Sequence, residues 1–225
     1  MKRPRLRPRC RANGADLIEL GIPYSDPTAE GPVIQAANLR ALQSGVTTDK
    51  IFDLVRELRR GVTIPMVFMT YANVVFSYGT ERFLSNCRDV GIDGLILPDV
   101  PYEERKNFSP RAASTASSSS PSSHRRRRIA LRSIAREAEG FLYIVLSLGV
   151  TGERSEIRTD LAPIVSLVRE NTDIPCAIGF GISTPEQAKK MADLSDGVIV
   201  GSAIVKLLAQ HGKDAPEHIG AYVKK

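Results

Sequence analysis

The 225-residue chain has few cysteines, no long apolar run and no apolar segment near its start. Cys10, Cys87 and Cys176 lie far apart without a Cys-x-x-Cys pair, which argues against a disulfide framework or a zinc site. The longest apolar runs have strand length, well below the roughly 20 residues that cross a membrane. The basic start lacks the apolar segment of about 7–15 residues that a secretory signal contains. We therefore expect a reducing, cytoplasmic location and no membrane partner.

Basic residues are concentrated in two short runs. The formal net charge is +6, but residues 1–11 hold six basic groups and no acid, and Arg125–Arg128 add four more. Without these ten residues the net charge is −4. A nucleic-acid surface needs basic residues spread over the fold, with aromatic residues among them. The two detached runs do not meet that requirement, and we exclude nucleic acid as the main partner.

Strand-like and helix-like segments alternate from Asp16 onward. This alternation favours parallel strands joined by right-handed crossovers, and the length suits one α/β domain of the (β/α)8 TIM-barrel type. Apolar residues in 48–60 recur three and four positions apart, as in a core-facing helix. Six strand-like runs are present, so we expect an incomplete or locally disrupted barrel. The runs cover residues 16–23, 65–70, 94–98, 141–145, 176–179 and 197–200.

Two segments stand where further strands are expected. Residues 1–13 are basic and are predicted to be disordered, although an Arg-rich, acid-poor start also occurs in organelle transit peptides. Residues 109–128 are a low-complexity Ser/Arg segment without apolar alternation, which we expect to provide no strand. A linker, an insertion or translation in the wrong frame would each explain this segment. We predict a single barrel domain over residues 14–225.

Carboxylates follow the first strand-like run. Glu19 lies near the carboxyl end of an otherwise apolar strand, where barrel enzymes place their chemistry. The next loop holds Asp26 and Glu30 between prolines and glycines that restrict its path. Carboxylates with different burial can divide acid and base roles. The alternative is a strand-end glutamate paired with a basic residue, followed by a solvated acidic loop.

Three glycine-rich segments follow later strands: Gly149-Val-Thr-Gly152, Gly179-Phe-Gly-Ile-Ser183 and Gly201-Ser-Ala-Ile-Val. Glycines let backbone N–H groups approach an anion, and the helix that opens at Gly201-Ser202 favours negative charge at its start. Barrels commonly bind phosphate between the loops after their last two strands and such a helix. The segments therefore predict a phosphate site, with tight turns that hold no ligand as the alternative.

These segments give the chain a specific resemblance. Residues 15–35 are similar to the signature segment of tryptophan synthase alpha subunits, and further matches follow in the family's order over roughly residues 14–106 and 133–210. The further matches are Tyr71-Ala-Asn, Leu97-Pro-Asp-Val-Pro, Gly149-Val-Thr-Gly, Ile178-Gly-Phe-Gly-Ile-Ser and Gly201-Ser-Ala-Ile-Val.

The resemblance implies roles for individual residues. Glu19 matches the catalytic glutamate, Glu30 stands in place of the catalytic aspartate, and Tyr143 matches a tyrosine near the reacting glycerol chain. For Tyr143 and the two pocket positions, ordinary barrel filling is the alternative. The phosphate positions are Gly152, Gly181, Gly201 and Ser202, and the indole-pocket positions are Tyr71 and Leu97.

The resemblance also implies an activity and a partner. Family members cleave indole-3-glycerol phosphate to indole and glyceraldehyde 3-phosphate by a retro-aldol reaction. No metal or organic cofactor is implied for this chain, whereas the partner beta subunit carries pyridoxal phosphate. The expected assembly is an α2β2-type hetero-oligomer, with residues 27–32 and 97–102 as candidate contact loops.

Departures from the family pattern leave two rivals open. Glu30 is one methylene longer than aspartate, the family's first strand and helix are missing before Gly14, and the Ser/Arg segment replaces its fifth strand. One rival is another phosphate-binding barrel, such as a sugar-phosphate epimerase or thiamine phosphate synthase. The other is an inert, degraded copy that only binds the beta subunit.

Overall fold

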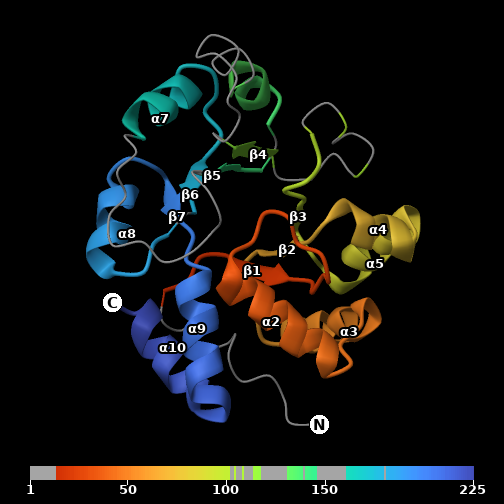
Figure 1. The fold of residues 1–225 in the computed structure, drawn as a ribbon. Helices are drawn as coiled ribbons and strands as arrows, with labels where there is room; N and C mark the ends of the chain where they lie inside the picture. The colour runs from red at the N-terminus through yellow and green to blue at the C-terminus, as the bar shows by residue number, and fades with distance from the viewer. Residues whose placement is uncertain are drawn as a thin grey trace. The chain divides into compact units, whose positions relative to one another are not determined.

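Two parallel β-sheets organise the chain (Figure 1). The computed structural model describes residues 14–101, 104, 108, 114–117, 131–138, 140–145, 161–179 and 181–225. A sheet of order β1-β2-β3 belongs to a first unit, which includes residues 14–28, 32–100 and 204–225. A sheet of order β4-β5-β6-β7 belongs to a second unit, which comprises the described parts of 29–31 and 101–203.

Strands and helices alternate in the first unit. Its strands are β1 (Ile18–Gly21), β2 (Met66–Met69) and β3 (Gly94–Ile96). Its helices are α2 (Pro32–Gln43), α3 (Thr48–Arg59), α4 (Ala72–Tyr78), α5 (Thr80–Val90) and α10 (Ala215–Val223), with the 3-10 turn η2 (Gly212–Asp214) before α10. Helix α9 (Ser202–His211) also belongs to this unit, except for its first two residues. Both strand pairs are parallel, so the sequence prediction of a parallel α/β arrangement is confirmed.

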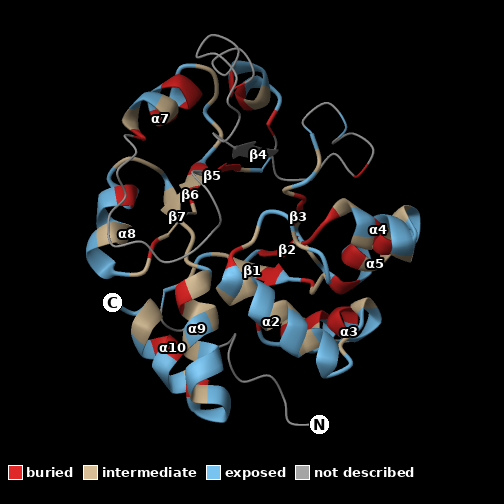
Figure 2. Cartoon of the chain, viewed as in Figure 1, coloured by how far each residue is buried: buried red, intermediate tan, exposed pale blue. Residues whose placement is uncertain are grey.

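The first sheet has one face covered by helices. Leu20, Phe68 and Leu95 are register partners on this face, and all three are buried. The Phe68 ring lies 5.7 Å from that of Phe52 on α3 and 6.2 Å from that of Phe83 on α5. Figure 2 shows buried residues on the strands and on one side of α3 and α5, whereas α2 has no buried residue. Because side chains alternate along a strand, odd-numbered Glu19, Val67 and Met69 point to the opposite face.

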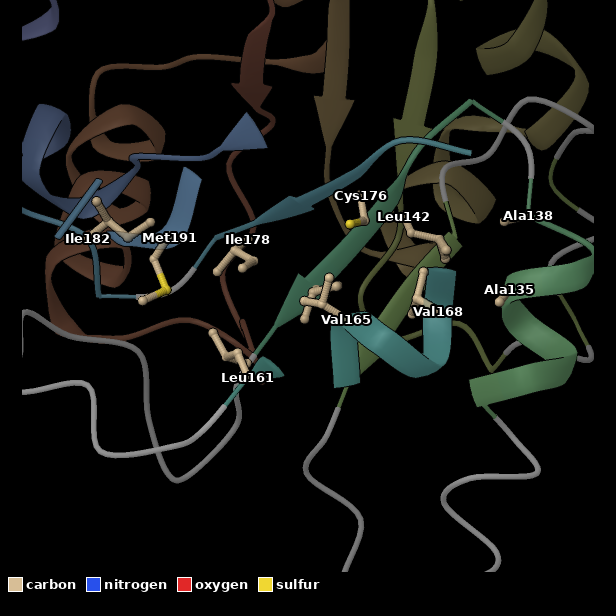
Figure 3. Close-up of a cluster of buried hydrophobic side chains, with 11 residues drawn as sticks. Ala135, Ala138, Leu142, Leu161, Val165, Val168, Cys176, Ile178, Ile182 and Met191 are labelled. Carbon is tan, nitrogen blue, oxygen red and sulfur yellow. The ribbon is translucent and has the colours of Figure 1, made fainter. Parts of the chain in front are cut away.

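The second unit repeats this plan. Its strands are β4 (Ser114–Ser117), β5 (Leu142–Val145), β6 (Cys176–Ile178) and β7 (Gly197–Val198), all paired in parallel. Its helices include α7 (Ala162–Arg169) and α8 (Pro185–Ala192), and residues 131–136 are also helical. Figure 3 shows Leu142, Cys176 and Ile178 from the strands packed with side chains from α7 and α8. This cluster is the core of the second unit.

Strand β4 corrects one expectation from the sequence. Ser114–Ser117 lie inside the Ser/Arg segment, which was expected to provide no strand, yet they pair with β5 from Ser114 opposite Leu142 to Ser117 opposite Val145. The physical reason is that parallel pairing uses backbone N–H and C=O groups, which serine carries as well as valine does. The missing apolar alternation therefore did not exclude a strand here. The predicted disorder of residues 1–13 falls outside the described residues.

An aspartate fixes the register of β2 against β3. Asp93 directly precedes β3, and its Oδ2 accepts the backbone N–H of Met66, the first residue of β2, at 2.8 Å. Its own N–H donates to the Met66 carbonyl at 2.9 Å. Arg59, at the end of α3, forms an ion pair with Asp93 and donates to the Ile64 carbonyl at 2.7 Å. We call the group formed by Asp93, Met66 and Arg59 a strand clamp.

A second strand clamp occupies the equivalent place in the second unit. Asp196 precedes β7 and accepts the N–H of Cys176, the first residue of β6, at 2.8 Å. It donates its own N–H to the Cys176 carbonyl at 2.9 Å. Arg169, at the end of α7, pairs with Asp196 at 2.8 Å. The bonded Cys176 N–H holds the pKa of the Asp196 carboxyl below its usual range, and Arg169 adds to this effect.

None of the helices within the described residues is long and apolar enough to cross a membrane. The described cysteines, Cys87 and Cys176, are free and buried. Burial raises the pKa of the Cys87 thiol to about 12, and that of Cys176 is raised as well. Both thiols therefore stay protonated near neutral pH and pack as small apolar residues.

The lowered pKa of Asp196 predicts a pH-dependent loss of stability. An unfolded aspartate titrates near pH 3.9, so the stability from Asp196 is complete above about pH 5 and is lost as the pH falls through the lower folded pKa. Asp196→Asn cannot ionise. We expect the difference in Tm between the parent and this variant, measured by circular dichroism, to stay constant from about pH 8 to 5 and to shrink below about pH 4. A difference that persists unchanged to about pH 3 would contradict the charged strand clamp.

Candidate active site

Glu19 is the residue of β1 that carries a carboxylate. It lies on the face of the first sheet that points away from the helices, which we call the inner face of that sheet, opposite Val67 of β2. Glu19 is half-buried, and its Oε2 is inaccessible to solvent. Its neighbours on β1, Ile18 and Leu20, are apolar and hold the strand against β2. The structure thus gives the predicted catalytic glutamate a fixed strand position rather than a loop position.

The loops after β1, β2 and β3 meet around α4. Tyr71 precedes α4 and is 2% exposed, and its ring lies 5.2 Å from that of Tyr24 in the loop after β1. Asn73 of α4 donates to the Tyr24 hydroxyl at 3.1 Å. Asp99, after β3, accepts the N–H of Ala72 through both carboxylate oxygens at 3.1 Å. Three loops are thereby joined at the carboxyl edge of the first sheet.

The register adds residues that the sequence analysis missed. Met69 and Ile96 are register partners, and alternation from Glu19 through Gly21 places them on the same inner face. Leu97, the residue proposed for the indole pocket, is buried but follows the end of β3, where its carbonyl accepts the Val100 N–H at 3.3 Å. A strict period-two reading of residues 94–97 would have selected Ile96 instead of Leu97, because successive side chains alternate between faces. The signal available in the sequence was the alternation of side chains between the two faces of each strand.

Tyr143 lies on the corresponding inner face of the second sheet. It is 7% exposed and stands opposite Ala177 of β6, while its neighbours Leu142 and Ile144 join the helix-covered core. A Cβ built on Gly179 would lie 2.5 Å from the Tyr143 hydroxyl and 2.8 Å from its Cζ. Only a residue without a side chain fits beneath this phenol. Gly179 therefore determines where the Tyr143 ring lies, a role that the sequence analysis did not assign.

The later glycine loops lie at one edge of the second sheet. Strands β6 and β7 are neighbours, and the Ile199 N–H donates to the Ile178 carbonyl at 2.9 Å, which brings the loops after both strands together. Gly181 has φ +64°, a conformation that favours glycine. Gly201 precedes α9, and a Cβ there would meet no atom within 4 Å. Gly152 and its segment fall outside the described residues.

The predicted site residues divide between the two units. Glu19, Tyr71 and Leu97 belong to the first unit. The other described positions, Glu30, Tyr143, Gly181, Gly201 and Ser202, belong to the second unit. Within each unit, the residues at strand ends lie at the carboxyl edge of a parallel sheet, where α/β proteins bind ligands. No group of three or more His, Cys, Asp or Glu side chains among the described residues has the arrangement to hold a metal ion.

Comparison with known proteins identifies the family. The sequence profile described as "Tryptophan synthase alpha chain" matches residues 8–223. The chain belongs to the tryptophan synthase alpha chain family. The alpha chain of Lacticaseibacillus casei is 47% identical over 212 residues, which cover 94% of this chain and 80% of that protein. That of Thermoanaerobacter pseudethanolicus is 48% identical over 197 residues, covering 88% and 75%.

Solved structures agree with this assignment. A chain of the tryptophan synthase a2b2 complex from Pyrococcus furiosus is 32% identical and matches 96% of this chain and 88% of its own length, with a TM-score of 0.83. A chain of the tryptophan synthase from Mycobacterium tuberculosis is 31% identical, with coverage of 96% and 82% and a TM-score of 0.83. The fold class predicted from the sequence, a TIM-type barrel that is locally incomplete, is thus confirmed.

The contact between Gly179 and Tyr143 predicts a sensitive position. The methyl group of Gly179→Ala would overlap the Tyr143 phenol, so the tyrosine must move. Misplacing an active-site group by about 1 Å can cost about 100-fold in rate, and we expect kcat/KM for indole release to fall by about that factor. Gly197→Ala in β7 is the matched control, because its Cβ would make only an ordinary 3.8 Å contact with Ala177. Equal losses in both variants would contradict a specific role for Gly179.

Proposed function

We propose that this chain cleaves indole-3-glycerol phosphate to indole and glyceraldehyde 3-phosphate, with Glu19 as the central proton-transfer group. The family assignment supports the reaction and disfavours the epimerase and thiamine phosphate synthase alternatives. The observation that carries the proposal is the position of Glu19, on the inner face of β1 with Oε2 withdrawn from solvent. General acid–base catalysis requires a carboxyl group held at a fixed position within hydrogen-bond reach of the substrate, and a strand residue on this face provides such a position.

In the proposed reaction, Glu19 transfers protons at two atoms of the substrate. It donates a proton to C3 of the indole ring and accepts the proton of the hydroxyl on the adjacent glycerol carbon. The bond between C3 and that carbon then breaks, and the alkoxide becomes the aldehyde of glyceraldehyde 3-phosphate. Glu30 accepts a hydrogen bond from the indole N–H, and its negative charge balances the positive charge that develops on the protonated ring. Tyr143 contacts the glycerol chain.

The phosphate is assigned to the glycine loops of the second unit. Gly181 and Gly201 have no side chain to shield their backbone N–H groups, and Ser202 begins α9, whose amino end favours an anion. The open space around the Gly201 Cα suits close approach of phosphate oxygens. Binding energy from this remote group positions the reacting carbon, which raises the rate of the chemical step. Gly152 is assigned to the same phosphate from the family resemblance alone.

The proposed assembly is an α2β2 complex in which the beta subunit receives the indole. The solved relative from Pyrococcus furiosus is such an a2b2 complex, which supports this partner. We assign pyridoxal phosphate to the beta subunit and no organic cofactor or metal to this chain. Free, buried Cys87 and Cys176 fit the reducing cytosol, where we expect the complex to act.

Glu19→Gln tests the proposed chemistry. The amide keeps the shape of the side chain but neither donates an acidic proton nor accepts one. We therefore expect kcat for indole release to fall by about 10²–10⁴-fold. Glyceraldehyde 3-phosphate should bind as it does to the parent, because its assigned site is in the second unit. Indole release is followed with indole-3-glycerol phosphate as the substrate.

Two outcomes of this assay would contradict the proposal. Full turnover by Glu19→Gln would remove Glu19 from the reaction. No turnover by the parent chain, alone and with a beta subunit, would favour the inert copy that only binds its partner.

Gly201→Val tests the phosphate site. A Cβ at this position would meet no atom within 4 Å, so we expect the fold to be kept. The Kd for glyceraldehyde 3-phosphate should increase by more than about tenfold, because charge-assisted hydrogen bonds are lost. Isothermal titration gives this Kd, and the Kd for indole is the internal control. A parallel loss of both ligands would point instead to a folding defect.

A further inference from the structure

We infer that Asp99 and Tyr24 are positioning residues that hold Tyr71 at the indole half of the site. The inference rests on the proposed function, in which Tyr71 lines the indole pocket. Neither residue was given a role by the sequence analysis. Both belong to the first unit, as Tyr71 does, and both contact the residues that directly follow it.

Asp99 caps α4 from outside the helix. Tyr71 occupies the N-cap position with extended backbone, φ −107° and ψ 152°, but its side chain makes no capping hydrogen bond. Asp99 supplies the missing acceptor for the Ala72 N–H, with both oxygens at 3.1 Å. A carboxylate at this end of a helix also interacts favourably with the exposed N–H groups. The start of α4 is therefore fixed by a residue 27 positions away.

The turn after β3 aims Asp99 at the helix. The Val100 N–H donates to the Leu97 carbonyl at 3.3 Å, which closes a four-residue turn with Pro98 and Asp99 in the central positions. Proline at the first central position presets its backbone angle for such a turn. The direction of the Asp99 side chain thus follows from β3, whose Ile96 carbonyl accepts the Thr70 N–H at 3.1 Å.

Tyr24 restrains the same residues from the loop after β1. Its hydroxyl accepts the side-chain N–H of Asn73 at 3.1 Å, and its ring lies 5.2 Å from the Tyr71 ring with the planes tilted by 35°. Tyr71 is 2% exposed, so its ring has little room to take another rotamer without moving Tyr24. Asp99 fixes the backbone beside Tyr71, and Tyr24 fixes its ring. Loss of either contact should loosen the indole half of the site.

Ligand binding to the full chain separates positioning from general stability. Asp99→Ala should weaken indole binding about tenfold, because a charge-assisted bond to the backbone beside Tyr71 is lost. Asp99→Asn keeps a neutral acceptor and should recover most of that affinity, to within about threefold of the parent. Tyr24→Phe removes only the hydroxyl and should weaken indole binding by about fivefold. The Kd for glyceraldehyde 3-phosphate should stay within about twofold throughout, since its assigned residues belong to the second unit.

Asp53→Ala on α3 is the matched control, because Asp53 is likewise an exposed carboxylate, but its partner is the side chain of Arg56 on the same helix. It should change neither Kd. Equal losses of indole and glyceraldehyde 3-phosphate affinity in Asp99→Ala would show a folding role and overturn the inference. Unchanged indole affinity in both Asp99→Ala and Tyr24→Phe would overturn it as well. Failure of the parent to bind indole would instead refute the proposed function, and the positioning role with it.

Discussion

The strand clamp is the interaction on which both sheets depend. In each unit an aspartate before one strand accepts a hydrogen bond from the backbone N–H of the first residue of the neighbouring strand and donates one to its carbonyl, and an arginine at the end of the helix before that neighbouring strand pairs with the carboxylate. A slip of one residue would turn every side chain to the other face. Asp93 and Asp196 fix the faces of β2 and β6, the strands against which β1 with Glu19 and β5 with Tyr143 pair.

This separation of tasks follows the ordinary logic of parallel α/β proteins. The amino ends of the strands carry the clamps, whereas the carboxyl ends carry Tyr71, the glycine loops and the loop with Tyr24. Stability and chemistry thus draw on different residues of the same strands. The small number of polar residues at the strand ends accounts for most of the candidate site.

Much of this arrangement could be predicted from the sequence. Apolar periodicity located the described strands other than β4, and the segment around Glu19 identified the family before any geometry was known. Periodicity failed at β4, because the backbone pairing of Ser114–Ser117 leaves no trace in side-chain hydropathy. Gly179 and Asp99 were missed for a different reason. Their roles depend on contacts with Tyr143 and Ala72, residues distant in the chain, and no local pattern encodes such contacts.

The paired clamps have a consequence for how the chain tolerates change. Each sheet carries its own register device, built from the same order of arginine, proline-led strand and Asp-Gly before the next strand: Arg59, Ile64-Pro65 and Asp93-Gly94 in one unit, Arg169, Ile174-Pro175 and Asp196-Gly197 in the other. In the second sheet, β4 from residues 109–128 pairs with β5, whereas the clamp joins β6 to β7, so this unusual segment contributes no residue to the clamp. The two clamps share no residue, so a substitution that breaks one clamp leaves the hydrogen bonds of the other in place.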